Sequence, residues 1–280
     1  MTSRTVQLSF SGLGARIIPD GFSESGYILE IGGAEQSHVD LADPTHIFYE
    51  YLRRIGNVID VLAPAGEPLA VVHLGAGALT LARYLQATRP GSAQIAVDIE
   101  RELPSLVIDE LPLPAGTRLN VIVDDARAVI ARLPDAVAQL CTQTGEEPTG
   151  AEPPVGLDAV ILDIFSGWSA PEHLTEETFY RELRGVLSPE GVMIIDVGDD
   201  PGLSFFTAQA RHLLNVCEHV WCLTEANMLD GKHPGNLILV GTPHALTDEL
   251  RARLTAAGPH PAVVLDTFEV GELIAKLEDH

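Results

Sequence analysis

Four short apolar runs in this chain each end on an aspartate, and this repeated pattern limits the possible fold more than any other feature. The runs cover residues 92–97, 119–123, 157–162 and 191–195, and they are followed by Asp98, Asp124, Asp163 and Asp196. Helix-like segments separate them, which is typical of an α/β fold with strands covered on both faces. Ligands of open α/β sheets bind outside the carboxyl ends of the strands. The pattern therefore predicts a ligand site lined by these aspartates.

The first 40 residues predict a different structure. Short, partly alternating runs are separated by glycines, a pattern typical of a small antiparallel sheet of β-hairpins. These runs cover residues 6–10, 16–19, 27–31 and 35–39. The dipeptide Asp43-Pro44 then predicts the start of a helix, with the aspartate as N-cap and the proline at the first helical position.

Charge is the strongest signal in the composition. Seventeen lysines and arginines against 40 aspartates and glutamates give the 280 residues a formal net charge of −23. Such a surface repels phosphate backbones, so we expect no nucleic-acid partner, whereas a small or cationic substrate is compatible with it. Three irregularly spaced cysteines and scattered histidines predict no disulfide framework and no metal site. Without a signal-peptide pattern or an apolar run near the ~18 residues of a membrane span, we expect a cytoplasmic protein with no membrane contact.

The segment His73-Leu74-Gly75-Ala76-Gly77 stands where an apolar strand is expected to turn into a helix. Glycines at 75 and 77 let the backbone approach a ligand, and the helix start offers free N–H groups. Asp98 follows at about the 20-residue spacing at which a carboxylate holds the ribose hydroxyls of an adenine nucleoside. Asp125 is then placed to accept a hydrogen bond from an exocyclic amine such as adenine N6. The turn lacks a third glycine and a lysine, which disfavours NAD and P-loop sites and favours a nucleoside carrying a sulfonium, as in S-adenosylmethionine.

Taken together, these motifs resemble the spermidine synthase (aminopropyltransferase) family. The likeness covers about residues 26–241, and it is carried by Glu35-Gln36-Ser37, residues 75–79, Asp98-Ile99-Glu100, Asp124-Asp125 and residues 158–166. The segments HLGAGALTLARY and HLTEETF further resemble the actinobacterial spermidine-synthase-like branch.

The resemblance implies a particular α/β fold. This is the class I S-adenosylmethionine-dependent methyltransferase-like (Rossmann-like) sheet, with a small N-terminal antiparallel β-hairpin domain. We accordingly expect three parts: the hairpin sheet over residues 1–43, the nucleoside-binding catalytic domain over 44–245, and a C-terminal helical tail over 246–280 packed on that domain. A homodimer through the N-terminal sheet or the main domain is compatible with the family.

Carried over position by position, the resemblance assigns roles on the nucleoside side of the site. It implies that Gln36 contacts the ribose or methionine part, that Asp98 holds the ribose hydroxyls, and that Asp125 faces the adenine amine, beside the turn at Gly75 and Gly77. It also implies that Asp163 lines the substrate pocket.

Two departures from the family pattern each remove a negative charge. Ala78 stands where the family has an aspartate that contacts the aminopropyl amine. Ser166 stands where the family's D-S-x-D loop supplies the general base. A serine hydroxyl cannot act as a base near neutral pH without help.

Other carboxylates near the strand ends could take over the missing base. The candidate catalytic residues are therefore Asp163, Ser166 and Asp199, with Asp196 as a substrate-binding group. The alternative for the acidic cluster is structural, because Asp200-Pro201 also has the pattern of a helix start.

Three further side chains are candidates for the amine substrate. Tyr49 and Glu50 stand at the first helix, where the family brings aromatic and polar groups to the amine. Trp168, on a Gly/Ser/Pro-rich loop, could stack on a ligand, or it could merely anchor the loop.

The leading hypothesis is a transferase that binds decarboxylated S-adenosylmethionine and moves its aminopropyl group to a small-molecule amine, as in polyamine biosynthesis. A methyltransferase that uses S-adenosylmethionine itself is the first alternative. A nucleoside-binding scaffold without catalysis is the second alternative.

Overall fold

The structure, a computed structural model, describes residues 4–142, 156–164 and 170–278. The chain divides into two compact units. Residues 1–52 and 63–153 form the first unit, and residues 53–62 and 154–280 form the second.

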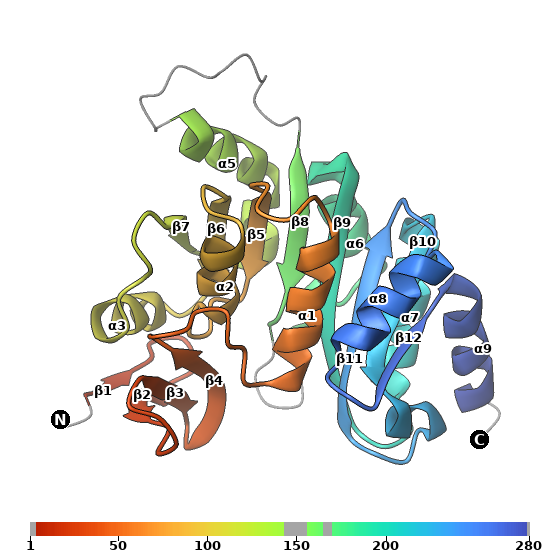
Figure 1. Cartoon of the computed structure of the whole chain (residues 1–280), viewed down its shortest axis with the longest axis horizontal. Coiled ribbons are helices and arrows are strands. Elements are labelled where there is room, and N and C mark those ends of the chain that lie inside the picture. The colour runs from red at the N-terminus through yellow and green to blue at the C-terminus, as the bar shows by residue number, and fades with distance from the viewer. Residues whose placement is uncertain (1–3, 143–155, 165–169, 279–280) are drawn as a thin grey trace. The chain divides into compact units, whose positions relative to one another are not determined.

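The N-terminal runs of the first unit form the predicted antiparallel sheet, drawn in red to orange in Figure 1. Its strands lie in chain order: β1 (Thr5–Gln7), β2 (Gly14–Pro19), β3 (Gly26–Ile31) and β4 (Ala34–Asp40). One face of the sheet buries Ile17, Leu29 and Val39 in a hydrophobic cluster that also contains Ala78 and Leu79, just before helix α2. The hairpin sheet thus packs against the glycine turn through apolar side chains.

The predicted helix start at Asp43-Pro44 is wrong. The first helix, α1, spans Glu50–Val61. The Asp43 carboxylate accepts a hydrogen bond from the Thr45 backbone N–H at 3.0 Å, and the His46 N–H donates to the Asp43 carbonyl at 3.0 Å. These bonds close a local turn, so the aspartate that was expected to cap a helix folds back on its own loop instead.

Three parallel strands follow in the first unit, in the order β5-β6-β7, as the continuous apolar runs predicted. The strands are β5 (Ala70–Leu74), β6 (Ala93–Asp98) and β7 (Arg118–Val123). The helical segments are α2 (Thr80–Thr88), α3 (Glu102–Glu110), α4 (Ala126–Val129), η1 (Ile130–Arg132) and α5 (Leu133–Thr142). Helix α5 packs against all three strands, and α3 packs against β1 and β2.

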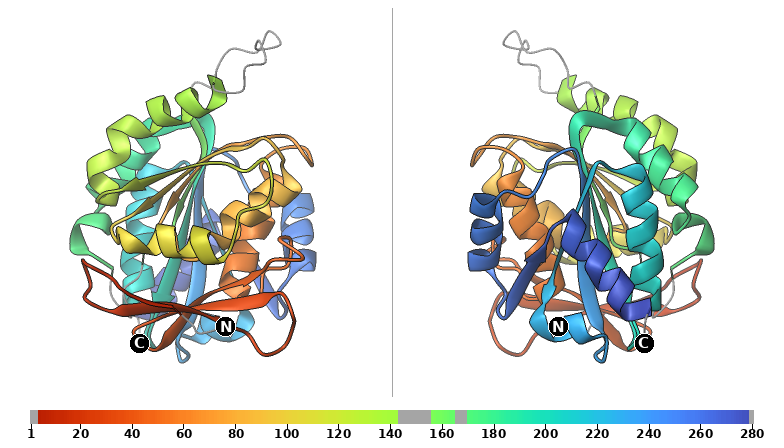
Figure 2. Two further views of the ribbon diagram at one scale, coloured as in Figure 1. Left: turned by 90° about the vertical axis from the view of Figure 1, so that its left-hand side faces the viewer. Right: turned by 90° about the vertical axis from the view of Figure 1, so that its right-hand side faces the viewer.

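In the described part of the second unit, five strands lie in the order β12-β10-β11-β9-β8, with β8 and β9 parallel and the other neighbours antiparallel. The strands are β8 (Leu157–Leu162), β9 (Leu187–Asp199), β10 (His219–Glu225), β11 (Gly235–Thr242) and β12 (Ala262–Leu265). The helices are η2 (Glu172–Leu174), α6 (Glu177–Val186), α7 (Ser204–Val216), η3 (Ala226–Asp230), α8 (Asp248–Ala257) and α9 (Thr267–Glu278). Helix α7 packs against β9, β10 and β11 and also contacts α6 and α9 (Figure 2).

The C-terminal tail adds a strand that sequence analysis missed. Its two amphipathic segments are helices α8 and α9, as expected, but β12 lies between them and pairs with β10 from Cys222–Leu265 to Glu225–Ala262. Across the described ranges, none of the helices combines the length and apolarity that crossing a membrane requires.

Candidate active site

Two glycines shape the turn between β5 and α2. Gly75 has a φ of 95° and Gly77 a φ of 47°. Residues with a Cβ rarely adopt such positive φ angles. A Cβ added at Gly77 would lie 2.8 Å from the Ser37 Oγ. Glycine at position 77 therefore meets both a backbone and a packing requirement.

Asp98, the last residue of β6, is bonded to this turn. One carboxylate oxygen accepts the Ala76 N–H at 2.9 Å and the other accepts the Glu100 N–H at 2.8 Å. Burial raises the pKa of Asp98, although the two N–H donors act against that rise. Each carboxylate oxygen can accept more than one hydrogen bond. The side chain can therefore hold the turn and still accept bonds from a pair of vicinal hydroxyls.

The loop after β7 holds Asp124 and Asp125 near the same edge of the sheet, since Asp98 is in register with Val123. The Asp125 carboxylate accepts the Arg127 and Ala128 N–H groups at 3.0 and 3.1 Å, which makes it the N-cap of α4. This capping role was not predicted from the sequence. The expected contact of Asp125 with an adenine amine remains a prediction.

Two exposed apolar side chains accompany these aspartates. Ile99, which follows the buried strand β6, is 38% exposed, and Val123, which ends the partly buried strand β7, is 43% exposed. An exposed apolar side chain beside a polar group is a suitable surface for a flat ring. Neither residue stood out in the sequence, because an apolar residue at a strand end ordinarily belongs to the core.

Strand β4 brings Gln36 and Ser37 to the glycine turn. The Ser37 Oγ accepts the Ala78 N–H at 3.3 Å, and the Thr80 hydroxyl donates to the His38 carbonyl at 2.9 Å. Gln36, the predicted nucleoside contact, is the direct neighbour of Ser37 and is partly buried. Sequence analysis missed Ser37, because a serine within a strand carries no signal of its own.

Tyr49 and Glu50 stand at the start of α1. The Tyr49 hydroxyl donates to a Glu35 carboxylate oxygen at 3.2 Å, and burial together with that negative charge raises the pKa of Tyr49 to about 12. The phenol is therefore neutral over the physiological range. Contact of Tyr49 and Glu50 with an amine substrate remains a prediction.

In the second unit, Asp163 and Asp196 are close neighbours. Leu162 is in register with Ile195 on the parallel strands β8 and β9, which places the following two aspartates side by side. Asp196 is 2% exposed. Burial raises its pKa well above the usual range, and the charge of Asp163 raises it further. Burial also raises the pKa of Asp163, to about 6.

Asp199, the third candidate of this group, has a structural partner. Its Oδ2 accepts the Phe206 N–H at 2.7 Å, and its Oδ1 accepts the Asp200 N–H at 2.8 Å. Helix α7 begins at Ser204, so the predicted helix start at Asp200-Pro201 is wrong, and Asp199 rather than Asp200 binds the first turn. Its candidate role as a base stays a prediction. Ser166 and Trp168 lie outside the described residues.

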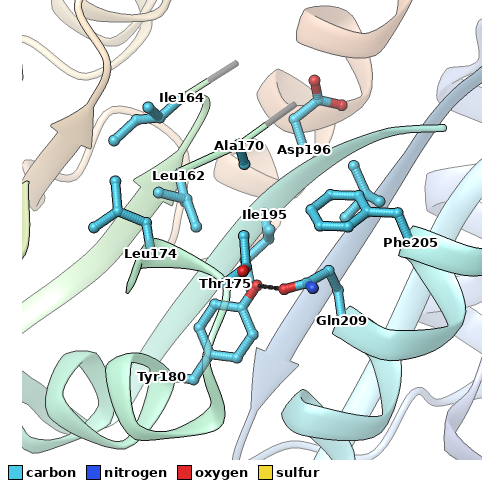
Figure 3. A pocket seen from close by; sticks show the side chains of 11 residues that line it. Leu162, Ile164, Ala170, Leu174, Thr175, Tyr180, Ile195, Asp196, Phe205 and Gln209 are labelled. Atoms are coloured by element: carbon cyan, nitrogen blue, oxygen red, sulfur yellow. Dashed lines mark hydrogen bonds between the residues drawn. The ribbon is translucent and has the colours of Figure 1, made fainter. Parts of the chain in front are cut away.

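A small pocket adjoins β8, β9 and the helices packed on them (Figure 3). It encloses about 270 Å³ of empty space, part of it open to solvent. Most of its lining is apolar: Leu162, Ile164, Ala170, Leu174, Thr175, Tyr180, Ile195, Asp196, Val197, Phe205 and Gln209. The Tyr180 hydroxyl donates to the Gln209 side-chain carbonyl at 2.6 Å. Within the described residues, no group of histidines, cysteines and carboxylates has a metal-binding arrangement.

Sequence comparison finds relatives of one kind. The chain is 28% identical over 201 residues to a polyamine aminopropyltransferase of Chromobacterium violaceum, covering 70% of this chain and 67% of that protein. It is 25% identical over 178 residues to the protein of that name from Neisseria meningitidis, of which it spans 59%. No protein-family model matches the chain.

Structure comparison agrees with these relatives. A probable spermidine synthase from Corynebacterium glutamicum has a TM-score of 0.82 and 25% identity, covering 98% of this chain and 94% of that one. In both sequence and fold, the chain is therefore similar to the spermidine synthases. This confirms the resemblance seen in the sequence.

Two more distant structures share the fold. A spermidine synthase in complex with the transition state analogue AdoDATO has a TM-score of 0.57 at 12% identity, covering 86% of this chain and 72% of that one. Human methyltransferase-like protein 13 in complex with SAH has a TM-score of 0.50 at 20% identity, with coverages of 82% and 89%. The predicted spermidine synthase fold, a methyltransferase-like α/β sheet with an N-terminal hairpin sheet, is confirmed.

Proposed function

We propose that this chain is an aminopropyltransferase that uses decarboxylated S-adenosylmethionine and a small amine. Relatives named polyamine aminopropyltransferase indicate a transferase. In the proposed reaction, the amine nitrogen attacks the carbon next to the sulfonium and forms the C–N bond. The C–S bond breaks, its electron pair stays on sulfur, and methylthioadenosine leaves. The proton lost by the nitrogen passes to a carboxylate.

The nucleoside half of this proposal rests on the first unit. The observation that carries it is Asp98, whose two oxygens hold the N–H groups of Ala76 in the glycine turn and of Glu100. These bonds fix the carboxylate where it can accept hydrogen bonds from the ribose hydroxyls. The exposed side chains of Ile99 and Val123 offer an apolar surface for the adenine ring. The proposed ligand class agrees with the nucleoside analogues named for the two distant neighbours.

The base is the part in which this chain differs from the family pattern. Ser166 cannot accept the amine proton unaided near neutral pH. Asp163 is the candidate replacement, because burial raises its pKa to about 6. Such a carboxylate is ionised at pH 7 and yet more basic than an ordinary aspartate, which suits a general base.

A methyltransferase that uses intact S-adenosylmethionine is the second candidate. It is favoured by Ala78, which is 1% exposed and leaves the turn without a carboxylate for the aminopropyl amine. The absence of that negative charge would also spare a cofactor carboxylate from repulsion.

Calorimetry with three ligands tests these functions on the full chain: decarboxylated S-adenosylmethionine, S-adenosylmethionine and methylthioadenosine. We expect the decarboxylated form to bind more tightly than the intact cofactor. Asp98→Asn should weaken methylthioadenosine binding about 10-fold or more, because a hydrogen bond to a charged group contributes about 1.5–3 kcal/mol. Asp109→Asn on α3, with a side chain 63% exposed, is the matched control and should bind normally.

The outcomes separate the three hypotheses. Preference for the decarboxylated form, with release of methylthioadenosine when an amine is added, supports aminopropyl transfer. Preference for the intact cofactor supports methylation instead. Absence of binding by all three ligands contradicts both enzyme hypotheses and leaves a scaffold.

A further inference from the structure

Asn236, on β11, makes a contact that the sequence did not indicate. In the β9–β11 register it lies opposite Gly198, whereas Asp196 lies opposite Ile238. The Asn236 side chain reaches diagonally along the sheet, and its Nδ2 donates to both carboxylate oxygens of Asp196, at 3.0 and 2.8 Å. One amide group therefore holds the whole carboxyl group of a residue that is 2% exposed.

Two neighbours surround Asn236. A Cβ at Gly198, the residue opposite, would lie 3.8 Å from the Asn236 Nδ2, in ordinary van der Waals contact. On the other side, the hydroxyl of fully buried Thr224 donates to the Asn236 carbonyl at 3.2 Å and ties its backbone to β10.

Asp196 in turn stands beside Asp163, because Leu162 and Ile195 are in register on parallel strands, and the Asp163 charge acts on it. Two neighbouring carboxyl groups, one buried and the other partly buried, cannot both be ionised at little cost, so such a pair retains one proton and titrates as a unit. From β8 the group that acts on Asp196 is the Asp163 charge, and from β11 it is the neutral Asn236 amide. The direction in which the Asp196 carboxyl group points then decides whether the shared proton lies between the two carboxyl groups.

We propose that Asn236 is a positioning residue that holds Asp196 against Asp163, so that the two aspartates share one proton and offer a single negative charge to the acceptor amine. The inference rests on the proposed function, because it takes Asp163 as the base. Asn236 acts through Asp196 and touches no reacting atom. It gives Asp196 a supporting role in place of direct substrate contact.

Asn236→Ala, measured in the full chain with decarboxylated S-adenosylmethionine and a diamine such as putrescine, tests this role. We expect kcat to fall by about 10-fold or more, within the range that a positioned base contributes, while the KM for the nucleoside stays unchanged. Asn120→Ala, at an exposed position of β7, is the matched control and should leave both constants unchanged.

A double-mutant cycle separates positioning from general structural damage. If Asn236 acts through Asp196, Asn236→Ala should add little to the loss already caused by Asp196→Asn. An equal loss from Asn236→Ala in both backgrounds overturns the inference.

Carbon-13 NMR titration of the aspartate carboxyl groups gives a readout that needs no turnover. The Asn236 hydrogen bonds favour the charged form of Asp196, so their loss should move the second ionisation of the pair to higher pH. An unchanged titration in Asn236→Ala overturns the inference even if the enzyme is active. Absence of methylthioadenosine release by the wild-type chain contradicts the proposed function instead. The titration then tests only whether Asn236 positions Asp196.

Discussion

The aspartates at the strand ends have the same chemistry but different surroundings, and the surroundings decide what each can do. Asp98 holds a turn through two N–H donors, Asp125 caps α4, and Asp199 binds the first turn of α7. Asp163 and Asp196 instead follow paired residues of two neighbouring parallel strands, and the charge of one raises the cost of ionising the other. A proton acceptor for an amine is therefore best sought in that pair.

The pair predicts that stability falls as pH rises. The pKa of Asp163 is about 6 in the folded chain, against about 3.9 for an unperturbed aspartate. Between those values the folded chain keeps a proton that the unfolded chain has released, so the stabilisation is complete below about pH 4 and is lost as pH rises through about 6. Asp163→Asn removes the part of this dependence that comes from Asp163, whereas burial still raises the pKa of Asp196. Relative to wild type, its free energy of unfolding should gain on the order of 2 kcal/mol between pH 4 and pH 8.

Urea denaturation at several pH values measures this difference. Asp109→Asn, exposed on α3, is the control whose curve should run parallel to that of the wild type. Parallel curves for Asp163→Asn as well would show that the carboxyl group is not perturbed.

At this scale the sequence allowed Asp98 to be singled out, because its distance from the glycine turn along the chain has a geometric meaning. The hydrogen bond of Asp199 to the first turn of α7 could not be predicted. It depends on helix α7 starting at Ser204, and an Asp-Pro dipeptide one residue later offered an equally good helix start. The contact of Asn236 with Asp196 could not be predicted for another reason. It depends on the register of β9 and β11, and no local sequence pattern encodes that register.

At the scale of elements, the turn between β5 and α2 is held by packing as well as by backbone conformation. Gly77→Ala should destabilise the fold by about 1–3 kcal/mol, because the left-handed conformation costs about 1–2 kcal/mol for a residue with a Cβ and the new methyl group would lie 2.8 Å from the Ser37 Oγ. Chemical denaturation measures the loss, and calorimetry with methylthioadenosine measures the accompanying loss of binding.

Two further variants separate the two causes. Gly66→Ala has a similar conformational penalty, at a φ of 79°, but no atom lies within 4 Å of the added carbon. It should lose only the backbone contribution and bind the nucleoside normally. Ser37→Ala in the Gly77→Ala background should recover part of the stability. Equal losses for Gly66→Ala and Gly77→Ala would contradict the packing argument.

The elements themselves were largely predictable. Buried strands such as β5, β6 and β8 appear in the sequence as largely apolar runs, because most of their side chains do not meet solvent. Strand β12 was missed because it is four residues long and follows a Pro-rich link, so that its pairing with β10 comes from tertiary structure alone. The helix predicted at Asp43 is the opposite error, an element predicted but not formed. Asp43 is a good N-cap residue, but here its carboxylate accepts a hydrogen bond within a turn.

For the molecule as a whole, the excess of acidic residues is the dominant property. A net charge of −23 destabilises any compact state by self-repulsion, and it also draws cations toward the surface. Salt weakens both effects, because it shortens the distance over which charges interact: the Debye length falls from about 10 Å at 0.1 M salt to about 3 Å at 1 M. Salt therefore acts in opposite directions on the stability of the fold and on the binding of a cationic amine.

We expect sodium chloride, raised from about 0.05 to about 0.5 M at pH 7.5, to increase the melting temperature by about 2–4 °C, the shift that corresponds to roughly 1 kcal/mol in a chain of this size. Over the same range the affinity for a cationic amine should fall while that for methylthioadenosine, a neutral nucleoside, stays constant. Differential scanning fluorimetry and calorimetry measure the two effects. Near pH 5, where many carboxylates are protonated, the salt dependence of the melting temperature should shrink. An undiminished dependence there would mean that salt acts through burial of apolar surface and not through screening of the net charge.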